Sequence, residues 1–190
     1  MNSRTVVDRV IDLFKKHGSS QYGGEAVTQA EHGLQAATHA RKLGLAPCQV
    51  AAALLHDIGH LLHHFPDDAP SKGIDDQHEE LGAAWLEKYF KPEVVEAVRM
   101  HVSAKRYLCS REAGYFESLS QPSVLSLKLQ GGPMDETECG RFETHRFFRE
   151  AVALRKLDEL AKDPQFKTPG VEDFKLELEA ALLETKGNRP

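Results

Sequence analysis

The chain has 190 residues, 41% of them hydrophobic and 28% charged, and its 24 basic and 29 acidic side chains give a formal net charge of -5. This composition is typical of a soluble globular protein of one domain that buries its own core, so it excludes a largely disordered chain and disfavours a broad nucleic-acid-binding surface. No apolar run approaches the roughly 18 residues of a membrane-spanning helix, and the charges within residues 1–16 argue against a secretory signal.

Three helices are expected in the first third of the chain. Apolar residues recur at helical spacing from Val6 onward, and Gly18 marks the end of that helix. Thr28 begins a capping-box pattern that opens a second helix running to about Lys42. Pro47 opens a third, whose small and dense apolar residues are typical of a buried central helix.

Helical patterns also dominate the rest of the chain. Residues 63–76 contain Pro and Gly and are expected to form a loop, after which Asp75 or Asp76 would cap a helix running to about Phe90. Further helices are expected at about residues 92–101, 110–119, 122–130, 143–162 and 171–184. No strand pattern is present, so the predicted fold class is all-α.

The histidine content is the unusual feature of the composition. The chain has ten histidines, and most of them fall between His32 and His101. His56 and Asp57 are adjacent at the end of the apolar third helix, where burial without partners would be costly. A metal ion would satisfy both side chains, although a dipeptide alone is better explained by a solvated helix end.

Single ligand-type residues on the neighbouring helices extend this pattern. Taken alone, each is better explained as an ordinary core or surface residue. Together they supply four histidines and two aspartates from five expected helices, namely His32, His56, Asp57, His78, His101 and Asp158. This set suffices for two octahedral metals that share one carboxylate, and imidazole with carboxylate suits iron or manganese better than a thiolate zinc site. The cysteines Cys48, Cys109 and Cys139 lie far apart, which favours a reducing cytoplasm.

The ligand series resembles a known superfamily. Its order, His, then His-Asp, then Asp, is similar to that of the HD-domain superfamily, and the two further histidines resemble the dinuclear members. Other segments resemble the PhnZ-type phosphonate oxygenases within it: residues 22–32, 101–108, 130–134 and 155–158. The resemblance covers about residues 22–170.

The resemblance implies a fold and an activity. The fold would be a single HD-domain helical bundle over residues 1–190, with its core at about 22–170, a C-terminal helix at 171–186 and a frayed tail at 187–190. The protein would be a cytoplasmic, mixed-valent di-iron dioxygenase with Fe2+/Fe3+ as cofactor and O2 as co-substrate. It would cleave the C–P bond of a 1-hydroxy-2-(amino or trimethylammonio)ethylphosphonate, giving glycine or glycine betaine and inorganic phosphate. The overall similarity slightly favours the primary amine.

Roles for individual residues follow from the same resemblance. One iron would be held by His32, His56, Asp57 and Asp158, and the other by Asp57, His78 and His101. The phosphonate would contact His60, Lys105, Ser123 and Arg155, and the pair Tyr22 and Glu25 would act as a lid that shields the iron. For Lys105 and Arg155 the alternative is a solvated helix face.

Two other functional classes remain open from the sequence. An HD-domain phosphohydrolase acting on a nucleotide or another phosphate ester would use the same ligands without redox chemistry. A metal-stabilised helical interaction module would need neither six ligands nor Lys105 and Arg155 nearby. The expected partner is a small hydroxyphosphonate, supplied by an upstream phosphonate hydroxylase, with no nucleic acid and no membrane.

Overall fold

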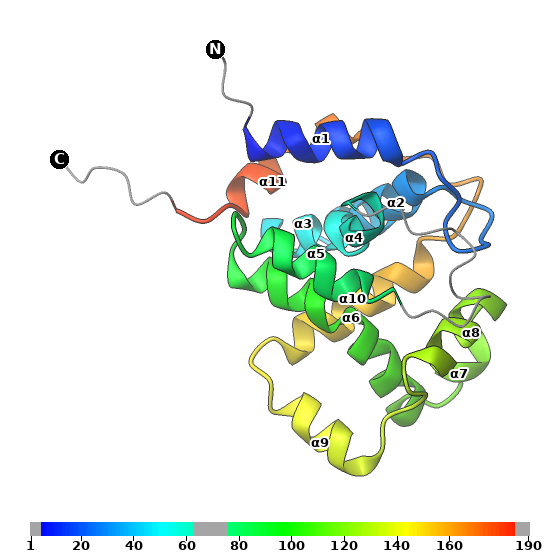
Figure 1. Ribbon diagram of the computed structural model, residues 1–190. Coiled ribbons are helices and arrows are strands. Elements are labelled where there is room, and N and C mark those ends of the chain that lie inside the picture. Colours follow the sequence, from blue (N-terminus) through cyan, green and yellow to red (C-terminus); the bar gives the residue numbers. More distant parts are fainter. Residues whose placement is uncertain (1–4, 63–75, 185–190) are drawn as a thin grey trace.

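The computed structural model describes residues 5–62 and 76–184, and most of the loop expected at 63–76 lies outside these ranges. The described helices, labelled in Figure 1, are α1 (Val6–His17), α2 (Gln29–Lys42), α3 (Pro47–Leu55), α4 (Ile58–Leu62), α5 (His78–Leu86), α6 (Pro92–Arg111), α7 (Tyr115–Ser118), α8 (Gln121–Leu129), α9 (Glu136–Glu143), α10 (Phe148–Leu160), the 3-10 helix η2 (Val171–Phe174) and α11 (Lys175–Ala180). Extended pairing in these ranges is limited to isolated bridges, Gln21 with Thr28 and Phe90 with Leu182. The all-α prediction is confirmed.

Local sequence signals account for most helix starts. The Thr28 hydroxyl accepts from the backbone N–H of Glu31, and the Glu31 carboxylate accepts from the N–H of Thr28, as the capping box predicts. Pro47 and Pro92 occupy first-turn positions of α3 and α6, where the missing N–H costs nothing. The first three helices therefore match the sequence-based expectation closely.

Other boundaries differ from the prediction. Helix α6 continues for ten residues beyond His101 to Arg111, so the predicted end at His101 is wrong. The expected single helix from about residue 143 begins only at Phe148, and α9 precedes it because Asp135 forms an unforeseen capping box. Helix α5 ends at Leu86 rather than about Phe90.

Three further details of the structure differ from the sequence-based prediction. The cap of α5 is Gln77, in a left-handed conformation with φ 48°, although Asp76 still accepts from the N–H of His78. Near the predicted helix at 110–119 only the short α7 forms, and the predicted final helix is divided between η2 and α11.

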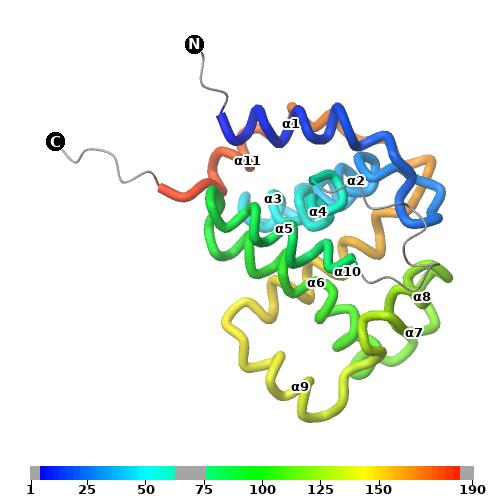
Figure 2. The backbone as a smooth tube through the Cα atoms, in the orientation of Figure 1, coloured from blue at the N-terminus to red at the C-terminus, as the bar shows by residue number. Residues whose placement is uncertain are grey.

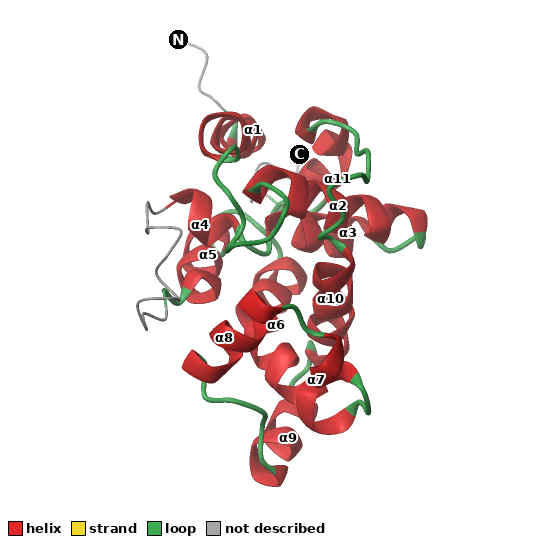
Figure 3. Cartoon of the chain, turned by 90° about the vertical axis from the view of Figure 1, so that its right-hand side faces the viewer, coloured by secondary structure: helices red, strands yellow, loops and turns green. Residues whose placement is uncertain are grey.

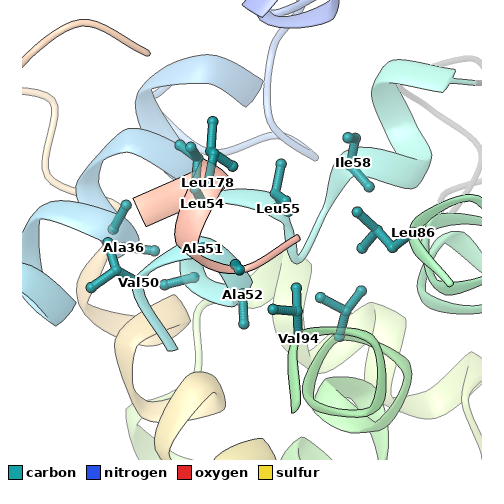
Figure 4. Close-up of a cluster of buried hydrophobic side chains, with 14 of the residues drawn as sticks. Ala36, Val50, Ala51, Ala52, Leu54, Leu55, Ile58, Leu86, Val94 and Leu178 are labelled. Atoms are coloured by element: carbon teal, nitrogen blue, oxygen red, sulfur yellow. The ribbon is translucent and has the colours of Figure 1, made fainter. Parts of the chain in front are cut away.

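The core is centred on α3, whose residues from Val50 to Leu55 are all buried. Figure 4 shows their side chains meeting Leu178 of α11 on one side and Val94 of α6 on another. An apolar helix without a polar face requires cover on all sides. Helices α2, α6, α10 and α11 provide it, and the site residues at the end of α3 are therefore placed deep inside the bundle.

The helices form a long bundle with distinct ends. Helix α1 packs with α11 at one end, and α7, α8 and α9 gather at the other (Figures 1 and 2). After rotation by 90°, α6 and α10 still connect the middle of the bundle to this second end (Figure 3). In the part of the chain that the structure describes, no helix combines the length and apolarity needed to cross a membrane.

Glycine permits one close contact that matters for the site. A Cβ atom on Gly59 of α4 would lie 2.1 Å from the carbonyl oxygen of His78 at the start of α5. Any larger residue would push the two backbones apart. Gly59 thus fixes the position of His78 relative to the end of α3.

Candidate metal centre

The six predicted ligands come from helices that meet in the centre of the bundle. His32 lies on α2, Asp158 on α10, and His56 and Asp57 lie in the turn between α3 and α4. His78 begins α5, and His101 lies in the middle of α6. The structure brings all six side chains together.

The first ligand group joins α2, α3 and α10. The Nε2 atoms of His32 and His56 are 2.9 Å apart, and His32 Nε2 is 3.2 Å from Asp158 Oδ1. Asp57 contributes Oδ2, at 3.5 Å from His32 Nε2 and 3.3 Å from His56 Nε2. Four donor atoms therefore converge on one point.

The second group uses the other oxygen of the same carboxylate. Asp57 Oδ1 lies 3.3 Å from His78 Nε2 and 3.5 Å from His101 Nε2. These two imidazole nitrogens are 3.2 Å apart. Asp57 thus faces both groups, one oxygen to each, which is the arrangement of a bridging ligand.

The outer nitrogens of the four imidazoles determine their tautomers. Nδ1 of His32, His56 and His101 lies 2.9, 2.9 and 2.7 Å from the backbone carbonyl oxygens of Ala161, Ala53 and Val98. Nδ1 of His78 is 2.8 Å from Asp76 Oδ1. Because carbonyl and carboxylate oxygens only accept, each Nδ1 donates, and each neutral ring presents the lone pair of Nε2 to the centre.

This arrangement fits bound metal ions. Paired Nε2 lone pairs at about 3 Å would repel each other, whereas two ligands on one metal at about 2.1 Å are separated by roughly this distance. Asp57 Oδ1 and Asp158 Oδ1 are buried, and the described residues give neither a hydrogen bond of acceptable geometry. Buried carboxylate oxygens without donors are costly unless a cation neutralises them. The six residues could therefore hold metal ions, and their donor set fits such a centre.

The charges around the two aspartates keep both ionised. Burial alone would raise the pKa of Asp57, but the surrounding imidazoles, His56 foremost, hold it well below its usual range. Burial acts in the same way on Asp158, and the guanidinium of Arg155 lowers the pKa of that carboxyl well below normal. Ionised carboxylates are the form that binds a metal.

Arg155 lies against a ligand rather than in open space. Its Nη1 donates to Asp158 Oδ2, its Nη2 to Glu159, and its Nε to the Tyr115 hydroxyl at 2.8 Å. Because a ligand carboxylate is oriented by its other hydrogen bonds, Arg155 positions Asp158. The predicted contact of Arg155 with a phosphonate stays a prediction.

Two lysines beside the centre, the buried Lys105 and the largely buried Lys162, donate hydrogen bonds to serines of α8. Lys105 Nζ donates to Ser126 Oγ at 2.8 Å, and Lys162 Nζ donates to Ser123 Oγ at 3.0 Å. Ser126 in turn donates to the carbonyl oxygen of Ser123, so the two hydroxyls lie one turn apart. The predicted residues Lys105 and Ser123 are thus linked through Ser126 of α8.

His60 lies at the edge of the second group. Its ring stacks on that of His78 with centroids 4.3 Å apart, and its Nδ1 is 3.2 Å from Asp76 Oδ2. A ligand atom of His60 also lies within 4.8 Å of those of Asp57 and His78. His60 is therefore close enough to contact a molecule bound at the centre.

Tyr22 and Glu25 occupy separate positions around the centre. The Tyr22 ring stacks on His32 with centroids 3.7 Å apart, covering the first ligand group. The Glu25 carboxylate accepts from the Ser120 hydroxyl at the start of α8 and lies 3.8 Å from Lys162 Nζ. In this structure Glu25 is turned toward α8 rather than toward the metal ligands.

Four polar residues of this region were not predicted from the sequence, namely Tyr115, Ser126, Glu159 and Lys162. Lys162 follows Arg155 by seven residues, two turns along the same helix face, so periodicity could have indicated it. Ser126 follows Ser123 by three residues in the same way. Tyr115 reaches Arg155 only through the tertiary fold, and no local signal predicts that contact.

Comparison with known proteins gives three findings. The family model described as HD domain matches residues 30–139, which include every proposed ligand except Asp158. The chain is 43% identical over 169 residues, 89% of this chain and 86% of the relative, to the [1-hydroxy-2-(trimethylamino)ethyl]phosphonate dioxygenase (glycine-betaine-forming) of Leisingera caerulea. It is 44% identical over 184 residues, 95% and 91% of the two chains, to the hydroxymethylphosphonate dioxygenase of Gimesia maris.

Proposed function

This chain belongs to the HD domain family and to its phosphonate dioxygenases, and from this we propose that it is an iron-dependent enzyme that uses O2 to cleave the C–P bond of a 1-hydroxyphosphonate. The carbon would become a carboxylic acid and the phosphonate group inorganic phosphate. One oxygen atom of O2 enters each product, so the reaction needs no further oxidant. Substrates of the two relatives differ only in the substituent on the hydroxyl-bearing carbon.

The bridging position of Asp57 is the observation that carries the proposal. A single carboxylate between two pairs of imidazoles supports two metal ions in contact with one substrate. Imidazole with carboxylate suits iron, which would supply a Lewis acid for the substrate hydroxyl and electrons for O2. We assign His32, His56, Asp57 and Asp158 to one iron, and Asp57, His78 and His101 to the other.

The remaining site residues would bind and enclose the substrate. Lys105, Ser123 and His60 lie beside the centre and offer donors to a phosphonate oxygen. Arg155 would add positive potential while it holds Asp158. The Tyr22 ring would exclude water from the first ligand group, and Gly23 and Gly24, with φ 49° and 89°, give its loop the freedom to move with Glu25.

The proposal is tested by phosphate release from ferrous-loaded protein with and without O2. Hydroxymethylphosphonate and the amino and trimethylammonio 1-hydroxyethylphosphonates serve as substrates, and a nucleoside monophosphate serves as control. Release that requires O2 and consumes it one to one would support the dioxygenase, and the largest kcat/KM would identify the substituent. Release from the nucleotide alone, independent of O2, would instead establish a phosphohydrolase.

The buried Lys105 should make substrate capture depend on pH. Burial and, next, repulsion by Arg155 lower the pKa of Lys105 to about 7. Only the ammonium form attracts a phosphonate, so kcat/KM should fall by up to about tenfold per pH unit above that pKa. In Lys105→Arg the charge persists, so the ratio of wild-type to variant kcat/KM should decrease from pH 6 to pH 9. This ratio cancels the titration of the substrate, and a constant ratio would contradict the role of Lys105.

A further inference from the structure

Lys162 lies where α10 ends and is held there by its own helix. Helix α10 finishes at Leu160, and Lys162 follows the capping residue Ala161. Its ammonium donates to Glu159 Oε1 at 3.0 Å, and its side chain is only 12% exposed. A cation at a helix C-terminus is also favoured by the helix dipole. Local structure thus fixes the ammonium near the site.

Glu159 links this lysine to Arg155. The same oxygen, Oε1, accepts from Arg155 Nη2 and from Lys162 Nζ. One carboxylate therefore fixes two cations that lie on the same side of α10. Substitution of Glu159 would remove one hydrogen bond from each of the two cations at once.

The ammonium of Lys162 also reaches α8. It donates to Ser123 Oγ at 3.0 Å and is 3.8 Å from Glu25 Oε1. An ammonium has three donors, and Glu159 and Ser123 account for two of them among the described residues. The third is available to an oxygen of a bound molecule.

Positive charge is in excess at this point of the bundle. Lys105, Arg155 and Lys162 are brought together, and the carboxylates paired with them among the described residues are Asp158, Glu159 and, at 3.8 Å from Lys162 Nζ, Glu25. With Asp158 assigned to a metal, three cations face two carboxylates. Burial is the largest cause of the lowered pKa of Lys162, Asp158 opposes it by raising that pKa, and repulsion by Arg155 lowers it further. Such an excess is relieved when an anion with several acceptor oxygens binds.

We propose that Lys162 is a further phosphonate-binding residue, paired with Lys105 across Ser123 and Ser126 and positioned by Glu159. The proposal rests on the proposed function, because it identifies a second ammonium at the anion end of the same substrate. The phosphonate oxygens would accept hydrogen bonds from two ammonium groups, that of Lys105 on α6 and that of Lys162 after the end of α10. The inorganic phosphate released as product carries the same oxygens, so it would bind there too.

The test measures anion binding without turnover. Metal-loaded protein is titrated anaerobically by calorimetry with inorganic phosphate and with methylphosphonate. In Lys162→Met the affinity should fall by about 10- to 100-fold, the effect of one hydrogen bond to a charged group, while the metal content stays the same. Lys162→Arg should retain most of the affinity. Lys156→Met is the matched control, because Lys156 lies nearby on α10 but pairs with Glu112 at the surface.

Each outcome has one meaning. Unchanged affinity in Lys162→Met, or wild-type protein that binds neither anion, would overturn the proposal. Should Lys162→Met not fold, Lys162→Gln removes the charge but keeps a donor for Ser123, and it should show the same loss. If the wild type cleaves a hydroxyphosphonate while Lys162→Met binds phosphate normally, the enzyme function stands and Lys162 has no part in it. If no hydroxyphosphonate is cleaved but the loss is seen, the anion site stands alone.

Discussion

Replacement of Asp57 with asparagine is expected to remove both metals and all O2-dependent turnover. Asparagine has nearly the same size as aspartate. The effect therefore reports only the loss of the negative charge and of the second metal-binding oxygen. Each Asp57 oxygen faces one pair of imidazoles at 3.3–3.5 Å, and the amide nitrogen would take the place of one of them. We expect kcat/KM to fall by more than about 100-fold, the upper range for residues that merely support a ligand.

Metal content and thermal stability check this expectation independently of activity. Iron per chain should fall from two toward zero. The wild type should gain about 2.7 kcal/mol of unfolding free energy at a free metal concentration 100 times Kd, a gain that Asp57→Asn should lack. Asp76→Asn is a graded control, because Asp76 is not a proposed ligand but supports His78 and His60 at the second group, so it should affect one metal. A variant with two irons and normal turnover would refute the bridging role of Asp57.

Replacement of Arg155 with methionine should cause the largest loss of stability among the site variants. The guanidinium is buried and bonds Asp158, Glu159 and Tyr115 at once. Removing one partner of a buried ion pair costs about 3–5 kcal/mol, because the other charge stays buried and unpaired. For a chain of this length the loss corresponds to a decrease in Tm of roughly 10 °C. It should be larger after chelation, when no metal neutralises Asp158.

Arg111→Met provides the comparison for Arg155→Met. Arg111 makes two hydrogen bonds to Glu136, but that carboxylate is 84% exposed, and exposed pairs contribute at most about 1 kcal/mol. Metal affinity should fall about 10- to 100-fold in Arg155→Met and stay unchanged in Arg111→Met. Equal Tm values for the two variants would show that the Arg155 cluster contributes little to stability.

The sequence predicted the fold best where a helix start has a specific side-chain signal. The capping box at Thr28 and the prolines at 47 and 92 are such signals, and each begins a helix as expected. The end of α6 was misplaced because nothing between His101 and Arg111 breaks a helix, so a boundary there had no physical basis. Asp135 and Glu138 carry the same capping-box signal at the start of α9, so that helix was also predictable from the sequence.

The six ligands could be predicted because histidine and aspartate at apolar helix positions are costly to bury unless a bound ion or a polar partner satisfies them. Their convergence could be predicted only from the resemblance of these segments to the HD-domain superfamily. The spacing of the residues in the sequence does not by itself place α10 beside α2. Lys162 and Glu159 were harder to predict, because charged residues near a helix end are usually solvated. Only the packing of α10 against α6 and the position of α8 show that these side chains are largely buried.

The ligands of the first group are contributed by segments at nearly opposite ends of the chain, from His32 to Asp158. A metal that joins them closes a loop through most of the polypeptide, as a disulfide would, and a cross-link over about 100 residues restricts the unfolded chain by about 4–5 kcal/mol. Synthesis proceeds from the N-terminus, so a nascent chain carries the histidines long before it acquires Asp158. The first site can close only when α10 has been made and has docked on α2. Metal binding at the first group would therefore require complete synthesis through α10, and a chain truncated before α10 would lack this cross-link between its two halves.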